Sequence, residues 1–125
     1  MIVDTDVLIW YSRGHKKAID LVHNFEGFSI SIVTYTEIIQ GMRNKQELNT
    51  FKNALGILQV KIVQIDELIS TKAMFFVEQY SLSHSLELAD ALIGATSILK
   101  QMPLITGNSK HYKHLPGIDV QKFLG

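Results

Sequence analysis

The sequence of 125 residues contains no cysteine, which excludes disulfide bonds, thiolate zinc sites and cysteine nucleophiles. It also lacks net charge, because 12 Lys and Arg residues balance 12 Asp and Glu residues. The chain as a whole therefore does not indicate a polyanion ligand, as a strongly basic domain would, and any contact with nucleic acid needs a local patch.

Long apolar segments are missing as well. The longest uncharged apolar stretch of interest, residues 91–99, is far shorter than the roughly 17 residues that cross a bilayer. The chain reaches Asp4 directly after Met1-Ile2-Val3, so it lacks the basic and apolar parts of a signal peptide. With 46% hydrophobic residues, no linker and no repeat, we expect one domain over residues 1–125, in the cytoplasm and without membrane contact.

Short β-branched runs alternate with amphipathic stretches of helical spacing. The strands are predicted at residues 2–3, 28–30, 61–65 and 104–106, with an edge strand at 118–120. The helices between them are predicted at residues 7–10 (ended by Gly14), 18–25, from Ser31 or Thr34 to Gly41, 51–58, 68–80 after the capping residue Asp66, and 88–100. Strands separated by crossover helices predict an α/β fold with a mostly parallel sheet and helices on both faces.

Acidic and amide side chains stand where this topology predicts a crevice. Asp4 follows the first strand, Glu37 lies on the helix after the second, and Asn108 follows the strand that ends at Thr106. In an open α/β sheet, ligands bind beyond the carboxyl ends of the strands, and Asp90 joins the group if its helix packs across that edge. Carboxylates gathered in one crevice repel one another unless a cation compensates, and oxygen ligands favour Mg²⁺ or Mn²⁺ over zinc.

These residues belong to four motifs that resemble, in order and over essentially the full length, those of PIN-domain ribonucleases, in particular the VapC-type toxins of bacterial toxin–antitoxin pairs. The motifs are Asp4-Thr5-Asp6 with Val7-Leu8-Ile9, Thr34-x-x-Glu37-x-x-x-Gly41, Ala89-Asp90-Ala91-Leu92-Ile93-Gly94-Ala95-Thr96, and Leu104-Ile105-Thr106-x-Asn108. The third motif is quite specific, whereas the first alone is weak.

The resemblance implies a PIN-like three-layer α/β/α sandwich with a mostly parallel central sheet of four to five strands. Asp4, Glu37 and Asp90 match the acidic triad with which the family binds Mg²⁺ or Mn²⁺ and hydrolyses RNA phosphodiester bonds. The resemblance also implies a homodimer and a small antitoxin whose tail covers the acidic crevice.

Two positions depart from the family pattern. Asn108 stands where many members carry a fourth acid, and Asp6 stands where Asn is common. The carbonyl of Asn108 could coordinate a cation without adding charge, and Asp6 could replace part of the missing charge. Asp6, Thr106 and Asn108 are therefore secondary candidates for the site.

Other readings of the same residues stay open. Asp4 could cap the first helix, and Asp90 could favour a helix N-terminus through the macrodipole. Asp-x-Asp after a strand also resembles haloacid-dehalogenase-type phosphatases, in which Asp4 would be a nucleophile. The third alternative is a catalytically weak PIN module that binds RNA or a protein partner. Loss of RNA cleavage with EDTA would separate the three.

Overall fold

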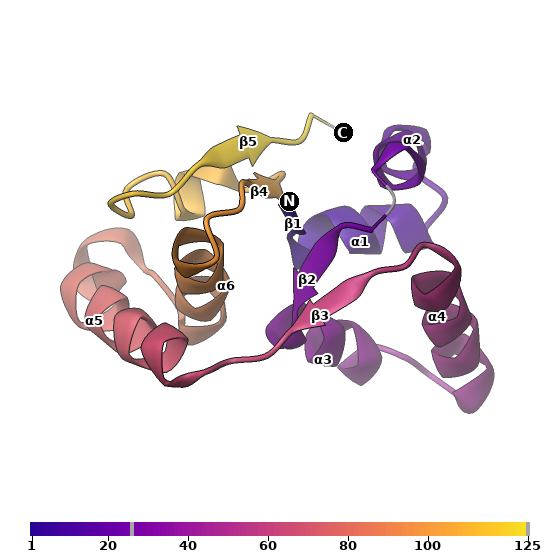
Figure 1. Ribbon diagram of the computed structural model, residues 1–125, viewed down its shortest axis with the longest axis horizontal. Helices are drawn as coiled ribbons and strands as arrows, with labels where there is room; N and C mark the ends of the chain where they lie inside the picture. Colours follow the sequence, from indigo (N-terminus) through magenta and orange to yellow (C-terminus); the bar gives the residue numbers. More distant parts are fainter. Residues whose placement is uncertain (26, 125) are drawn as a thin grey trace.

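The centre of the fold is a five-stranded sheet in the order β3-β2-β1-β4-β5, seen in the computed structural model, which describes residues 1–25 and 27–124 (Figure 1). Every pair of neighbouring strands in this sheet is parallel. The strands are β1 Ile2–Val3, β2 Ser29–Ser31, β3 Lys61–Val63, β4 Leu104–Thr106 and β5 Val120–Lys122. The predicted α/β fold with a parallel sheet is confirmed.

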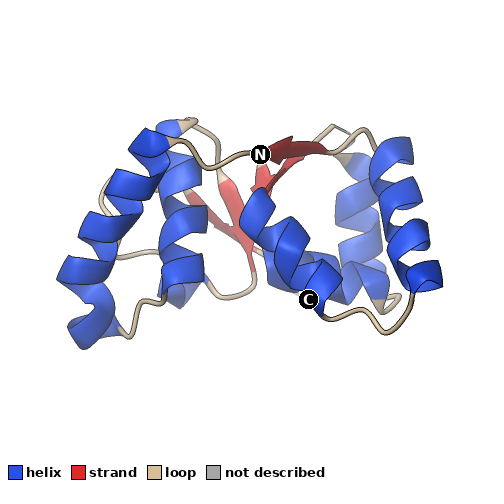
Figure 2. Ribbon diagram, turned by 90° about the horizontal axis from the view of Figure 1, so that it is seen from below, coloured by secondary structure: helices blue, strands red, loops and turns tan. Residues whose placement is uncertain are grey.

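Helices lie on both sides of the sheet (Figure 2). They are α1 Thr5–Ser12, α2 Lys16–Asn24, α3 Ile32–Gln40, α4 Lys45–Ile57, α5 Glu67–His84 and α6 Leu88–Leu99, and a short 3-10 helix, η1, covers Ser109–His111. The side chains of Asp4, Ser31, Asn44 and Asp66 accept backbone N–H groups at the starts of α1, α3, α4 and α5. Across residues 1–25 and 27–124, no helix has both the length and the apolar character to cross a membrane.

Three strand predictions are wrong at their boundaries. The second strand covers Ser29–Ser31 rather than residues 28–30, because these three residues pair with β3. The last strand begins at Val120 rather than at residue 118, because Val120 is the residue that pairs with Leu104 and the chain turns at Gly117, whose φ is +85°. The third strand ends at Val63 rather than at residue 65, because its partner β2 ends at Ser31, opposite Val63. Pairing with neighbouring strands, which the local pattern does not show, decides the boundaries of all three strands.

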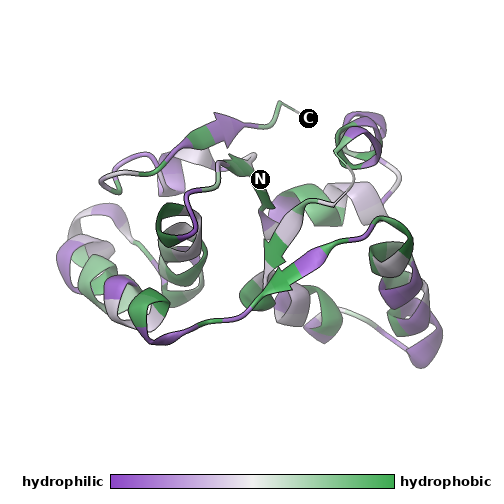
Figure 3. Cartoon of the chain, viewed as in Figure 1, coloured by the Kyte–Doolittle hydropathy of each residue, from purple (hydrophilic) through white to green (hydrophobic). Residues whose placement is uncertain are grey.

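The core consists of two clusters, one on each face of the sheet. Ile2 packs with residues of α5 and α6, whereas the next residue, Val3, packs with residues of α1, α2 and α4. This alternation is the two-residue period of a strand, so the helices of both layers meet the central strand β1. Hydrophobic residues concentrate on β1 and α6, whereas the start of α4 is hydrophilic (Figure 3). The residue directly after β1 is Asp4, which stands at the carboxyl edge of the sheet, next to this core.

Candidate active site

Asp4 caps α1 at the end of β1 and is only 5% exposed. Its Oδ1 accepts the N–H of Thr5 at 2.8 Å, and its Oδ2 accepts the hydroxyl of Thr106 at 2.8 Å. Burial raises the pKa of Asp4 above its usual value, and these two hydrogen bonds lower the pKa in part. The carboxylate is thus oriented by β1, by α1 and by the neighbouring strand β4.

Asp6 lies in the first turn of α1, beside Asp4. Its Oδ1 accepts the N–H of Val7 at 2.8 Å, and its Oδ2 accepts the N–H of Gly107 at 2.9 Å and the Nδ2 group of Asn108 at 3.2 Å. Burial, followed by repulsion from the charge of Asp4, raises the pKa of Asp6 to about 6.

The segment after β4 therefore holds both acids of the first motif. The Oγ1 atom of Thr106 donates to Asp4 and accepts the N–H of Asn108 at 3.0 Å. A Cβ atom at Gly107 would lie 2.7 Å from Oδ2 of Asp6, so a side chain here would force the Asp6 carboxylate to move. Glycine at position 107 is what allows the backbone N–H to reach the Asp6 carboxylate.

Asp90 lies in the first turn of α6 and faces the segment that follows η1. The hydroxyl of Tyr112 donates to its Oδ1 at 3.3 Å, and Nδ1 of His111 lies 3.8 Å from its Oδ2. Burial raises the pKa of Asp90, the nearby His111 lowers it, and the charge of Asp4 raises it further. Asp4 and Asp90 are therefore close enough for each to oppose the ionisation of the other.

Glu37 is exposed on α3 and lies at the edge of this group. Its Oε1 accepts the hydroxyl of Thr5 at 2.8 Å, and Thr5 Oγ1 is also 2.9 Å from Oγ1 of Thr34. Glu37 is thus linked through Thr5 to the residue next to Asp4. Hydrogen bonds join Asp4, Asp6, Thr106 and Asn108, and Asp90 extends this acidic network through its proximity to Asp4. Glu37 lies beside the network.

His111 and Tyr112 belong to the same network, and sequence reasoning did not select them as site residues. The sequence alone marks neither residue, because a single histidine without zinc-ligand spacing is an ordinary surface residue and a tyrosine is an ordinary core residue. The signal that could have identified His111 and Tyr112 is their position shortly after the Thr-Gly-Asn turn. One turn of 3-10 helix there returns the chain toward α6.

Comparison with known proteins identifies the family. The sequence matches the PIN domain over residues 1–116. The chain belongs to the PIN-domain family. A relative with a curated name, Ribonuclease VapC1 of Methanocaldococcus jannaschii, is 30% identical over 118 residues, which cover 92% of this chain and 80% of the relative.

Solved structures show the same fold. A chain of a toxin–antitoxin complex from Klebsiella pneumoniae superposes with a TM-score of 0.75 at 24% identity, covering 98% of both chains. A chain of VapBC-1 from nontypeable Haemophilus influenzae gives a TM-score of 0.77 at 18% identity and covers 97% of this chain and 96% of its own. The Asp-x-Asp sequence that suggested a phosphatase is accordingly the first motif of a PIN domain.

The donor chemistry of this PIN domain fits a hard divalent cation. In the described ranges, no Lys or Arg lies within ion-pair distance of Asp4, Asp6 or Asp90, and His111 is the one basic partner of Asp90. Buried carboxylates that raise one another's pKa and lack a permanent cation are stabilised by a bound metal ion. Within residues 1–25 and 27–124, however, no three His, Asp or Glu side chains form a ready-made ligand set. The triad Asp4, Glu37 and Asp90 therefore stays a prediction.

Asn108→Asp should lower the free energy of unfolding of the metal-free PIN domain and raise its affinity for Mn²⁺. The amide of Asn108 donates to Asp6, whereas a carboxylate in its place would repel Asp6. A charge pair about 4 Å apart is worth about 1 kcal/mol even in water, so Mn²⁺ affinity measured by calorimetry should rise severalfold. Asn53→Asp, on the exposed side of α4, is the control. Unchanged affinity in Asn108→Asp would place this residue outside the coordination shell.

The raised pKa of Asp6 predicts how the stability of the metal-free protein depends on pH. The folded protein binds the Asp6 proton more tightly than the unfolded chain does, so the free energy of unfolding should fall as pH rises from about 3.8 to about 6. Above that pH window, Asp6 causes no further fall in the free energy of unfolding. Asp6→Asn should show a smaller fall over the same window, measured by urea unfolding in EDTA. Equal pH profiles in both proteins would contradict the raised pKa.

Proposed function

We propose that this PIN-domain protein is a Mg²⁺- or Mn²⁺-dependent endoribonuclease that hydrolyses RNA phosphodiester bonds in the cytoplasm. The observation that carries the proposal is that Asp4, at the end of β1, lies near enough to Asp90, at the start of α6, for its charge to raise the pKa of Asp90. Neither acid has a Lys or Arg partner among the described residues. The 30% identity to a protein named as a ribonuclease supports the same reaction.

Asp4, Glu37 and Asp90 would hold the cation. When bound, a divalent cation lowers the pKa of a coordinated water and neutralises charge that develops on the phosphate. Thr106 and the N–H of Thr5 fix both oxygens of Asp4, so this carboxylate needs no reorganisation as charge develops. Thr5 links Glu37 to the same end of β1. Lys110 and Lys113, exposed on either side of His111 and Tyr112, would contact RNA phosphates.

Cleavage assays with a single-stranded RNA and with a small phosphomonoester test this reaction. RNA cleavage should stop in EDTA and return with Mn²⁺, and the phosphomonoester should stay intact. Hydrolysis of the phosphomonoester in preference to RNA would favour the phosphatase, in which Asp4 is a nucleophile. Binding of RNA without cleavage under any metal condition would favour the catalytically weak binding module.

We further propose that the ribonuclease is the toxin of a toxin–antitoxin pair. A structural neighbour that carries this fold comes from a toxin–antitoxin complex, and the exposed Glu37 and partly exposed Asp90 offer a basic antitoxin residue an ionic partner. Expression of the wild-type protein should arrest cell growth, whereas Asp90→Asn should not. Sequencing of the RNA ends formed in those cells would identify the target. Growth unaffected by an active, soluble ribonuclease would contradict the toxin proposal.

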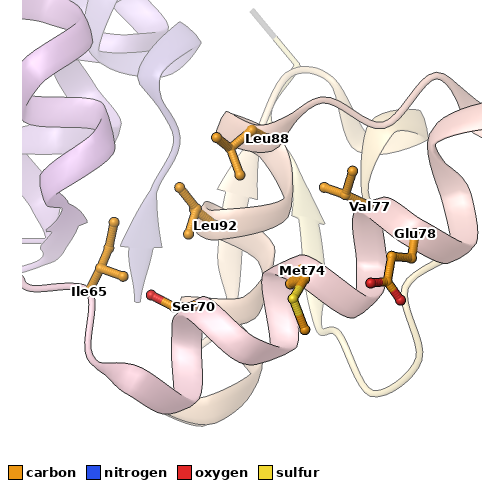
Figure 4. A pocket seen from close by; sticks show the side chains of 7 residues that line it. All are labelled: Ile65, Ser70, Met74, Val77, Glu78, Leu88 and Leu92. Atoms are coloured by element: carbon orange, nitrogen blue, oxygen red, sulfur yellow. The ribbon is translucent and has the colours of Figure 1, made fainter.

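The homodimer is proposed on a separate surface. An apolar groove of about 460 Å³ lies between α5, α6 and the segment before α5, lined by Ile65, Ser70, Met74, Val77, Glu78, Leu88 and Leu92 (Figure 4). Met74 is 49% exposed and Leu88 is 62% exposed, and Glu78 is the one charged side chain among the lining residues. In a two-fold dimer, the same surface of both subunits forms the interface. A patch with few charges can therefore pack against the same patch of a second copy with little electrostatic repulsion.

Met74→Glu should therefore convert a dimer into a monomer, because two-fold symmetry would bury two new carboxylates in one interface. Sedimentation equilibrium at micromolar concentration measures the change. Ile57→Glu, which places a charge on the exposed surface of α4, should leave the dimer intact. A wild-type protein that is monomeric at these concentrations would contradict the proposal.

A further inference from the structure

Tyr112 has a fully buried ring and a hydroxyl that points into the acidic network. Only 1% of the residue is exposed, and the ring belongs to the core cluster that contains Ala91, Ala95 and Leu115. A buried tyrosine hydroxyl needs a hydrogen-bond partner, since an unsatisfied one is costly. The partner here is Oδ1 of Asp90 at 3.3 Å.

Gly94 leaves room on α6 for Leu115 and, beside it, Tyr112. Asp90 and Gly94 are four residues apart, so they lie on the same face of the helix. A Cβ atom at Gly94 would lie 3.6 Å from Cδ1 of Tyr112 and 2.7 Å from Cδ1 of Leu115. The missing side chain lets the segment that carries Tyr112 pack closely on α6, which brings the hydroxyl within reach of Asp90, one turn earlier.

The hydroxyl donates its hydrogen bond to Asp90 and lies near enough to Asp4 to affect that acid too. It lowers the pKa of Asp4 as well as that of Asp90. The burial of Tyr112 and the charges of Asp4 and Asp90 raise the pKa of the phenol, so it keeps its proton and stays a donor. Tyr112 is thus a neutral donor, supplied by the core, that bonds Asp90 in the first turn of α6 and lies close to Asp4 at the end of β1.

We propose that Tyr112 is a positioning residue that holds Asp90 beside Asp4 in the orientation in which the two carboxylates bind the cation. The inference rests on the proposed metal-dependent function and adds a residue that none of the four motifs contains. Oδ1 of Asp90 is bonded to Tyr112, whereas Oδ2 accepts no hydrogen bond from Tyr112 and lies near His111. A carboxylate that is fixed in this way loses less freedom when it binds a metal ion.

Titration of Mn²⁺ into Tyr112→Phe by calorimetry tests the proposal. The phenyl ring preserves the packing against Gly94 and removes only the hydroxyl. Loss of a residue that orients a ligand weakens metal binding by about 10-fold to about 100-fold, and we expect a change in that range. Tyr11→Phe is the matched control, because the Tyr11 hydroxyl contacts Nε2 of His23 at 3.3 Å on the exposed surface.

A second measurement separates positioning from a general structural defect. If Tyr112 acts through the cation site, the RNA cleavage rate of Tyr112→Phe should approach that of the wild type at saturating Mn²⁺, with a higher half-saturating concentration. Equal Mn²⁺ affinity in the wild type and Tyr112→Phe would overturn the inference while leaving the proposed function intact. A rate that stays low at every Mn²⁺ concentration would also overturn it. Absence of Mn²⁺ binding by the wild type would overturn the proposed function and the inference together.

Discussion

Asp4→Asn and Asp90→Asn should each lower RNA cleavage by at least about 100-fold, the scale of losing one key electrostatic stabiliser. Asparagine keeps the shape of each side chain and one acceptor oxygen, but it removes the charge that would bind the cation. For Asp4, the retained oxygen can accept the N–H of Thr5 or the hydroxyl of Thr106, so the start of α1 should remain capped. Initial rates at a fixed Mn²⁺ concentration, with circular dichroism to verify folding, measure the effect.

Asp20→Asn is the matched control for this experiment. Asp20 is exposed on α2, outside the acidic network, so its variant should cleave RNA at the wild-type rate. Near wild-type cleavage by Asp4→Asn or Asp90→Asn would remove that residue from the proposed active site. A loss in all three variants would indicate a general effect of charge on RNA binding instead.

Asp90→Asn should also raise the melting temperature of the metal-free protein and shrink the stabilisation that Mn²⁺ provides. The pKa of Asp90 is raised by burial and by Asp4, so its charge opposes folding in the absence of metal. In the wild type, a cation that binds only the folded state stabilises it by about 2.7 kcal/mol at a hundredfold excess over the dissociation constant. The variant should lose much of this gain, so both effects should appear in the same protein.

Melting curves in EDTA and in millimolar Mn²⁺ separate this result from a simpler role for Asp90. As an acid near the start of α6, Asp90 could serve only the helix dipole, and its neutralisation would then cost about 0.3–1 kcal/mol. In that case the metal-free variant would melt below the wild type, and the Mn²⁺ shift would be undiminished. That pair of observations would exclude Asp90 from the cation site.

Much of the fold could be predicted because local signals and topology agree. Capping residues such as Asp66 mark helix starts, and the alternation of short strands with helices requires parallel pairing. The strand ends could not be predicted, because they depend on which residues face each other across the sheet. The isoleucine-rich run at 61–65 gives the clearest strand signal, yet β3 is an edge strand with Lys61 and Ile62 exposed.

The part of the candidate site that depends only on strand order could be predicted from the sequence. Asp4 and Thr106 end adjacent parallel strands, so their meeting follows from the strand order once β1 lies beside β4. The exposure of Glu37 could not be predicted, because flanking isoleucines on a helix do not tell which way the acid faces. The contact of Tyr112 with Asp90 depends on how closely η1 packs on α6, which is a property of tertiary structure.

Two backbone amides turn this network into a spectroscopic reporter. The N–H of Thr5 donates to Asp4, and the N–H of Gly107 donates to Asp6. The proton chemical shift of each amide therefore reports the charge of its own carboxylate, and it should move when that carboxylate takes up a proton. Both signals can be followed in a diamagnetic Mg²⁺ titration, which would show separately whether each of the two acids responds to the cation. A side chain at position 107 would displace the Asp6 carboxylate, so the amide signal of Gly107 reports on a contact that glycine leaves undisturbed.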